Sequence, residues 1–236
     1  FKKFYAPNNA TLVVAGNVDV DAVFKMVEKW FGPIPAQPSY LRDLPQEPAQ
    51  TEKRFLEVES SVPVDAIYKV YHMPGKASPD YHRADLLSDI LGRGNSSRLH
   101  VKLVEEDKLF TNVSAYVLGS SDPGLMVITG KLAEGTQFED AERAIDEVAN
   151  PSTGSSVAER ELTKVKNQAI SSVEFGEVEA LNRAMNLAFY DLLGNPGLAN
   201  EESEKIKAVS LKDIHEASET LLKQENSAVM YYHAKK

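Results

Sequence analysis

The chain has 236 residues, 42% of them hydrophobic, which is enough to bury the core of one large domain or of one domain and part of another. Its 35 acidic and 26 basic residues give a net charge of −9, which disfavours a general nucleic-acid-binding surface. The absence of cysteine excludes a disulfide framework, a thiolate zinc site and a cysteine nucleophile, but does not choose between cytoplasm and periplasm. No apolar run is long enough to span a bilayer.

The first fifty residues read as the end of one domain and a connector. The pattern predicts an apolar strand over residues 10–16, then an amphipathic helix that Asp19 caps and that Gly32 and Pro33 end. We interpret residues 1–36 as the remnant of a preceding domain, because a globular unit seldom begins with such elements. Frequent prolines then predict a stiff, extended linker over residues 37–50.

A second domain is predicted over residues 51–236, and its first half is rich in strands. Two runs of β-branched and aromatic residues predict strands at 54–60 and 64–72. Ser78 and Pro79 begin a helix, and another helix is expected over 97–107. Strands at 110–118 and 125–132 follow, joined by the turn SSDPG.

The second half of this domain is mainly helical. Apolar spacing predicts helices over 138–148, 157–175 and 178–193, the last ending at Gly194. Ser210 and Asp213 form a capping-box pattern for a final helix ending near Lys223, and a strand over 228–233 closes the chain. Strand-rich then helix-rich order predicts an α+β fold, a mainly antiparallel sheet with helices packed on one face.

The histidines do not form a recognisable metal motif. None of the five belongs to an HxxEH or HExxH pair, which would place two imidazoles on one helical face. The nearest pattern is HEASE, where His215 and Glu219 lie one turn apart, and a solvent-exposed helix commonly carries such residues. The sequence therefore predicts no metal site and no catalytic residue in this chain.

The segment LGRGNSSRL at residues 91–99 is the strongest local feature. Its glycines permit unusual dihedral angles, its Asn and Ser residues can cap the following helix, and two arginines bracket the turn with positive charge. One interpretation is a well-capped turn between helices, and the other is a loop that faces a substrate. On the second interpretation the candidate substrate-binding residues are Gly92, Arg93, Gly94, Asn95 and Arg98.

Together, the 5–35 block, the proline-rich linker, this loop, SSDPG and the helical second half resemble the M16 metallopeptidases, the family of insulinase, pitrilysin and the mitochondrial processing peptidase. The loop is similar to the LGxGxSSRL signature in the second domain of bacterial M16B members, where it borders the peptide-binding chamber. The resemblance implies an M16/LuxS-like metallohydrolase domain, here the inactive C-terminal domain of a zinc endopeptidase. It also implies that the parent's zinc, bound by an HxxEH motif upstream, activates the attacking water.

One departure from the family pattern concerns catalysis. Complete M16 pairs carry an Arg and, seven residues later, a Tyr after this loop, and the matching positions here hold Val104 and Thr111. The resemblance then implies no catalysis by this fragment alone. Its expected partners are a peptide substrate, its own N-terminal zinc domain and a second M16 subunit or half that supplies Arg and Tyr, but no nucleic acid.

The alternative is a non-catalytic M16-like scaffold or peptide-binding subunit. An intact HxxEH motif upstream, followed by a glutamate, would favour the enzyme, and its loss would favour the scaffold.

Overall fold

The chain forms two compact units, which are described separately. The structure is a computed structural model that describes residues 4–38, 43–45, 47–149 and 156–235. The larger unit comprises Pro48–Ala169 and Lys205–Lys236, and the smaller comprises Phe1–Glu47 and Ile170–Glu204. Parts of the predicted remnant and linker, residues 1–3, 39–42 and 46, lie outside the described residues, as do residues 150–155 and 236 of the predicted second domain.

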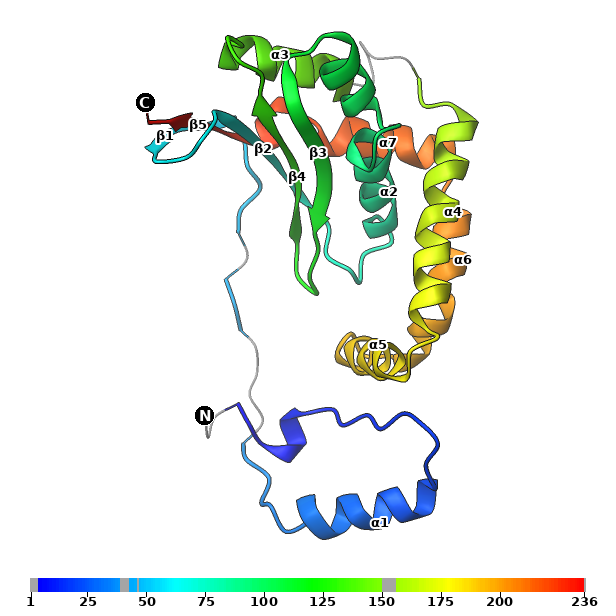
Figure 1. Cartoon of the computed structure of the whole chain (residues 1–236). Coiled ribbons are helices and arrows are strands. Elements are labelled where there is room, and N and C mark those ends of the chain that lie inside the picture. Colours follow the sequence, from blue (N-terminus) through cyan, green and yellow to red (C-terminus); the bar gives the residue numbers. More distant parts are fainter. Residues whose placement is uncertain (1–3, 39–42, 46, 150–155, 236) are drawn as a thin grey trace. The chain divides into compact units, whose positions relative to one another are not determined.

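The larger unit is built on a five-stranded sheet (Figure 1). In spatial order the strands run β1-β5-β2-β4-β3; β1 and β5 are parallel, and every other neighbouring pair is antiparallel. The predicted mixed, mainly antiparallel sheet is thus confirmed. The strands are β1 (Arg54–Ser60), β2 (Ala66–Met73), β3 (Phe110–Leu118), β4 (Gly124–Leu132) and β5 (Ser227–Ala234).

Helices cover one face of this sheet, as the sequence predicts. They are α2 (Tyr81–Gly92), α3 (Phe138–Ala149) and α7 (Leu211–Leu221) (Figure 1). Alternate strand residues such as Ile67, Met126 and Ile128 are fully buried beneath them, as the two-residue period of a strand requires. The apolar core of the unit therefore lies between the sheet and these three helices.

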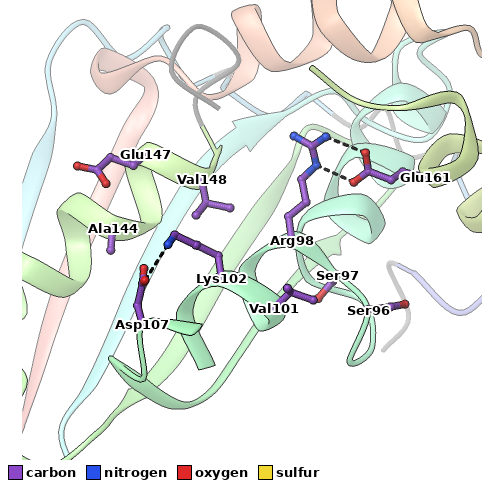
Figure 2. A pocket seen from close by; sticks show the side chains of 10 residues that line it. All are labelled: Ser96, Ser97, Arg98, Val101, Lys102, Asp107, Ala144, Glu147, Val148 and Glu161. Atoms are coloured by element: carbon purple, nitrogen blue, oxygen red, sulfur yellow. Dashed lines mark hydrogen bonds and ion pairs between the residues drawn. The ribbon is translucent and has the colours of Figure 1, made fainter. Parts of the chain in front are cut away.

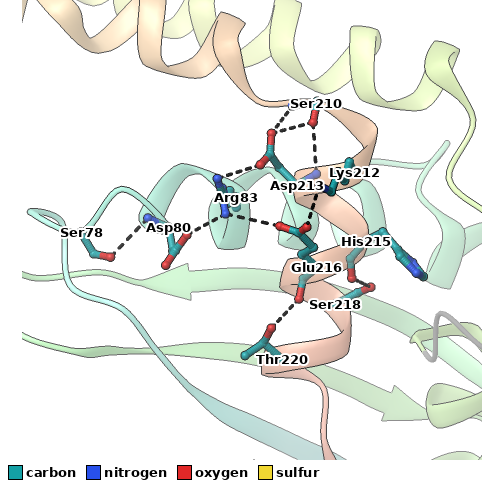
Figure 3. Close-up of polar contacts among 10 residues, drawn as sticks. All are labelled: Ser78, Asp80, Arg83, Ser210, Lys212, Asp213, His215, Glu216, Ser218 and Thr220. Carbon is teal, nitrogen blue, oxygen red and sulfur yellow. Dashed lines mark hydrogen bonds and ion pairs between the residues drawn. The ribbon is translucent and has the colours of Figure 1, made fainter.

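Arg83 of α2 ties that helix to the start of α7 (Figure 3). Its guanidinium lies 2.9 Å from a carboxylate oxygen of Asp80 and 2.7 Å from one of Asp213. Asp213 also completes the predicted capping box, because its carboxylate accepts from the Ser210 backbone and its own N–H donates to the Ser210 hydroxyl. The cap therefore fixes both the beginning of α7 and its contact with α2.

A buried charged cluster joins α3 to the sheet. Lys69 of β2, only 1% exposed, places Nζ 2.9 Å from Glu142 Oε1 and 2.6 Å from Asp146 Oδ1. Lys53 and the Tyr231 hydroxyl also donate to Glu142. Burial raises the pKa of the Glu142 carboxyl, but these donors outweigh burial and hold the pKa below its ordinary value. The cluster provides the buried Lys69 ammonium with carboxylate partners and connects α3 to the sheet.

The smaller unit contains α1 (Val20–Phe31) and α5 (Ala180–Leu192), and its boundaries fall within α4 (Glu159–Gly176) and α6 (Glu202–Ala208). Asp19 caps α1 as predicted, since its side chain accepts from the Ala22 N–H at 2.7 Å. The apolar faces of both helices are open: Phe24 is 68% exposed and Leu181 67%. Short 3₁₀ turns at Pro7–Asn9, Pro196–Glu201 and Gln224–Asn226 complete the described chain.

Three sequence expectations need correction. Residues 10–16 form no strand, because no described segment pairs with them in a ladder. The helix predicted over 97–107 is largely the π-helix η2 (His100–Glu106), in which the Asp107 N–H bonds to the Lys102 carbonyl at 2.9 Å. The short helix α6 was not predicted. No described helix is both long and apolar enough to cross a membrane.

Candidate functional site

The candidate loop leaves α2 at a glycine that packs against the edge strand β3. A Cβ atom added to Gly92 would lie 1.8 Å from the Ala115 backbone nitrogen, a distance that no side chain tolerates. Gly92 is therefore required by close packing and not by an unusual dihedral angle, which corrects the sequence expectation at this position. The loop begins in contact with one edge of the sheet.

Gly94 does adopt the dihedral angle that the sequence predicts. Its φ is +78°, and an added Cβ would meet nothing within 4 Å. The Ser97 N–H bonds to the Gly94 carbonyl at 3.1 Å and closes the turn. Arg93, Asn95 and Ser96 are exposed on this turn, so their side chains are accessible to a ligand.

Both arginines of the loop are paired. Arg93 lies 2.8 Å from Asp89 on the preceding turn of α2. Arg98 makes a two-pronged contact with Glu161 of α4, with Nε at 2.7 Å from Oε1 and Nη2 at 2.8 Å from Oε2. The Arg98 hydrogen bonds hold the pKa of the Glu161 carboxyl below its ordinary value. Neither guanidinium is a lone cation awaiting an anionic ligand.

A hollow of about 480 Å³ lies beside the loop (Figure 2). The Arg98–Glu161 pair borders one side and the Lys102–Asp107 pair, 2.7 Å apart, the other. Val101, Ala144 and Val148 supply apolar wall. The hollow thus combines an apolar surface with charges that are already neutralised, which suits an uncharged group better than an ion. Its full lining is Ser96, Ser97, Arg98, Val101, Lys102, Asp107, Ala144, Glu147, Val148 and Glu161.

The two positions that hold the substrate-polarising Arg and Tyr in complete M16 pairs are Val104 and Thr111, which follow the loop in the chain. Val104 is half-buried in η2, and Thr111 is exposed at the start of β3, where its hydroxyl donates to the Lys131 carbonyl at 3.3 Å. Neither side chain can place a guanidinium or a phenol on a substrate carbonyl. Lys108 between them has a φ of 55°, a left-handed conformation that reverses the chain between η2 and β3.

The HEASE segment carries a contact between a histidine and a carboxylate of the kind common on exposed helices. His215 Nε2 lies 3.4 Å from Glu219 Oε1 on α7, and both side chains are more than half exposed. Within the residues that the structure describes, no group of three or more His, Asp or Glu side chains is placed to hold a metal ion.

Sequence reasoning did not identify two residues that contact the loop. Glu161 lies 63 residues after its partner Arg98, and Lys164 lies 68 residues after Ser96, whose carbonyl and hydroxyl it reaches at 3.1 Å each. No spacing rule connects positions so far apart. The sequence predicted only the helix over residues 157–175 that carries both side chains.

Comparison with known proteins agrees with this fold. Residues 1–169 match the family model described as the peptidase M16 inactive domain. An uncharacterized zinc protease of Bacillus subtilis, YmxG, is 26% identical over 216 residues, which is 90% of this chain and 51% of that protein. The zinc protease PqqE of Helicobacter pylori is 24% identical over 166 residues, covering 69% of this chain and 37% of PqqE.

Solved structures show the same architecture. A protease from Helicobacter pylori superposes with a TM-score of 0.82 at 19% identity, covering 92% of this chain and 54% of that one. A peptidase M16 inactive domain from Pseudomonas fluorescens gives 0.76 at 15% identity, with 94% and 52% covered. The first half of the periplasmic protease PqqL from Escherichia coli gives 0.77 at 15%, with 99% and 53% covered.

The chain spans about half the length of YmxG and a smaller share of PqqE. The family model covers more than half of the chain, and the fold agrees with structures of that family. The chain therefore belongs to the M16 peptidase family and carries its inactive domain, homologous to bacterial zinc proteases.

Proposed function

We propose that this chain is the non-metal part of a zinc-dependent M16-type endopeptidase and that it forms a wall of the peptide-binding chamber. The observation that carries the proposal is the loop at residues 92–98, which begins beside the edge strand β3. Among the described residues no strand pairs with the outer edge of β3, so backbone groups that lie away from the contact between Gly92 and Ala115 can bond an extended peptide. The exposed turn and the adjoining hollow supply side-chain contacts beside that edge.

The first 36 residues fit the end of a preceding domain. Exposed Phe24 and Trp30 on α1, with Leu12 and Val14 just before it, are apolar side chains without a core of their own. The curated relatives are longer than this chain, so they contain additional sequence with which such a surface can pack. On this proposal residues 10–16 become a strand only beside the sheet of that domain, residues 37–50 link the domains, and residues 51–236 form the inactive one.

Catalysis on this proposal requires groups that lie elsewhere. An inactive M16 domain is usually paired with another M16 half, and we expect the HxxEH zinc site in the parent's N-terminal domain. Because Val104 and Thr111 replace the Arg and Tyr of complete pairs, a second subunit or half would supply those side chains. Zinc would lower the pKa of a bound water and polarise the peptide carbonyl, while this chain would hold the peptide.

Peptide binding by the chain tests the chamber role. Gly94→Asn is compatible with a positive φ and adds a side chain where no atom lies within 4 Å, so the fold should be retained. Gly135→Asn is the matched control, because Gly135 has a φ of +82° and equally open space but lies in the β4–α3 turn. Fluorescence anisotropy with labelled casein peptides should show weaker binding for the Gly94 variant alone. Equal affinity of both variants and the wild type would contradict the loop's role.

The second candidate is a non-catalytic scaffold or peptide-binding subunit. The observation that favours it is that Val104 and Thr111 provide no polarising group while both loop arginines are already paired. The coding sequence ahead of residue 1 separates the candidates, since HxxEH followed by a glutamate indicates the enzyme. If that motif is present, activity should need a partner with Arg and Tyr, and Val104→Arg with Thr111→Tyr should lessen the need.

Zinc analysis and a quenched-peptide assay on this chain alone test the expected inactivity. We expect neither stoichiometric zinc after dialysis against trace metal nor cleavage. Chelator-sensitive turnover coupled to one bound zinc would contradict the proposed division of labour.

A further inference from the structure

The geometry points to Glu161 and Lys164 as positioning residues that hold the loop at residues 92–98 in its peptide-binding conformation. This inference rests on the function proposed above and concerns the control of the same site. Both residues lie near the start of α4, an element that the resemblance did not connect with the loop.

Glu161 and Arg98 hold each other through two hydrogen bonds, and each side chain also bonds to the backbone. The planar guanidinium meets the carboxylate through two parallel hydrogen bonds, at 2.7 and 2.8 Å. Arg98 Nη2 also donates to the Ser156 carbonyl at 2.9 Å, and Glu161 Oε2 also accepts from the Ala158 N–H at 2.8 Å. With 16% of the Arg98 side chain and 31% of the Glu161 side chain exposed, the pair is shielded more than a surface ion pair.

Lys164 provides the second point of attachment. It lies three residues after Glu161 and therefore on the same face of α4. Its Nζ reaches both the carbonyl and the hydroxyl of Ser96. The helix thus holds the loop on both sides of Ser97, at Ser96 and at Arg98.

Other restraints act at the start of the loop, where Gly92 packs against Ala115 and Arg93 pairs with Asp89. An added Cβ at Gly94 would meet no atom, and the turn is closed by the single backbone bond from Ser97 to Gly94. The Ser97 hydroxyl is buried and has no hydrogen-bond partner among the described residues, so the side chain of Ser97 adds no hydrogen bond to this restraint. The contacts to α4 therefore restrain the second half of the loop, residues 96–98, and the wall of the hollow that Arg98 and Glu161 form.

Glu161→Gln tests this role, because it keeps the side-chain shape and removes the charge. Arg143→Gln is the matched control, since it removes an exposed ion pair with Asp140 on α3 and neither residue lines the hollow. Hydrogen exchange of the Ser97 and Val101 amides reports on the loop, and anisotropy of fluorescein-labelled casein peptides reports on binding. Glu161→Gln should speed exchange at these amides by about five- to tenfold and weaken peptide affinity by a similar factor. Arg143→Gln should change neither.

A double variant separates positioning from general destabilisation. Arg98→Gln with Glu161→Gln should behave like Glu161→Gln alone, because both changes remove one contact. Glu161→Asp, which keeps the charge, should restore part of the affinity. Exchange that speeds throughout the sheet as much as in the loop would overturn the inference, since the residue would then only stabilise the fold.

The two proposals fail in different ways. Unchanged affinity in Glu161→Gln together with weakened affinity in Gly94→Asn would overturn this inference and leave the chamber role in place. A wild-type chain that binds no casein peptide would overturn the chamber role, and the positioning role with it.

Discussion

The two units of this chain handle apolar side chains in opposite ways. In the larger unit the sheet and the helices α2, α3 and α7 enclose fully buried residues such as Leu86 and Ile128. In the smaller unit α1 and α5 are also amphipathic, yet Phe24, Trp30 and Leu181 remain largely exposed. Burying such side chains is the main source of folding free energy, so the larger unit is stabilised by its own core.

The difference teaches that amphipathicity alone does not make a domain. A helix with an apolar face gains stability only when another surface removes that face from water. Large exposed apolar faces are typical of surfaces that bind other protein. The apolar faces of α1 and α5 are therefore candidate surfaces for contact with other protein, and the following substitutions test the contrast between the units.

The largest effect should come from a glycine of the larger unit, compared with a glycine of the smaller unit. Gly92→Ala forces a Cβ into the Ala115 backbone and should cost the larger unit at least about 3 kcal/mol of unfolding free energy. Gly176→Ala in the smaller unit places its Cβ in open space and should change stability by less than about 0.5 kcal/mol. Denaturant unfolding followed by circular dichroism measures both. A Gly92→Ala chain as stable as wild type would show that the helix can move away from β3.

The next largest effect should come from replacing a leucine by alanine in the larger unit, compared with the same replacement in the smaller unit. Leu86→Ala opens a cavity at a residue 1% exposed and should cost about 3 kcal/mol. Leu181→Ala removes an exposed side chain and should leave the unfolding midpoint of the chain unchanged. If Leu181→Ala proves equally destabilising, the smaller unit has a core of its own and the contrast is wrong.

Acid should weaken the larger unit through Glu142. Its donors hold its pKa below the ordinary value of 4.5, so its contribution to stability is fully present above about pH 4.5 and is lost as the pH falls through the lowered native pKa. Glu142→Gln should cost about 2 kcal/mol at neutral pH by weakening the partnering of buried Lys69. The variant should also lose part of the wild type's decline in stability below pH 4.5. An unchanged acid profile would assign that decline to other carboxyl groups.

Helix caps should give the smallest effect and the most direct comparison. Ser210→Ala removes the cap of α7 and should lower the unfolding free energy of the larger unit by about 1 kcal/mol. Asp19→Ala removes the same kind of cap from α1, but should only reduce helical signal in circular dichroism without moving the main transition. A shift of the main transition in Asp19→Ala would mean that α1 unfolds together with the sheet.

Much of the fold could be predicted because the helices and strands of the larger unit follow from the local sequence and pack on one another within the unit. Runs of apolar, β-branched and aromatic residues predicted the strands of the sheet, and the Ser210–Asp213 pair predicted the start of α7. The failures occurred where structure depends on something outside the local pattern. Residues 10–16 have strand-like composition, but a strand needs a neighbour to bond. The π-helical hydrogen bonds of η2 and the short, charged α6 leave no distinctive apolar period.

The candidate site was predictable as a segment but not as a set of contacts. Glycines and capping residues identified residues 92–98, and Gly94 has the backbone conformation expected of it. The need for Gly92 comes from Ala115 on another element, and Arg98 finds its partner on α4. A sequence displays charge and flexibility directly, whereas pairing across dozens of residues is decided by the tertiary fold.

The strand order has a consequence for how the polypeptide is made. In the sheet, β5 lies between β1 and β2, so β1 has no partner strand until residues 227–234 have been synthesised. During translation β2, β3 and β4 can pair as soon as they emerge from the ribosome, while β1 waits through more than half of the chain. A nascent chain arrested before residue 227 would leave an unpaired edge on both β1 and β2. Such intermediates are natural clients for chaperones, because unpaired strand edges promote aggregation.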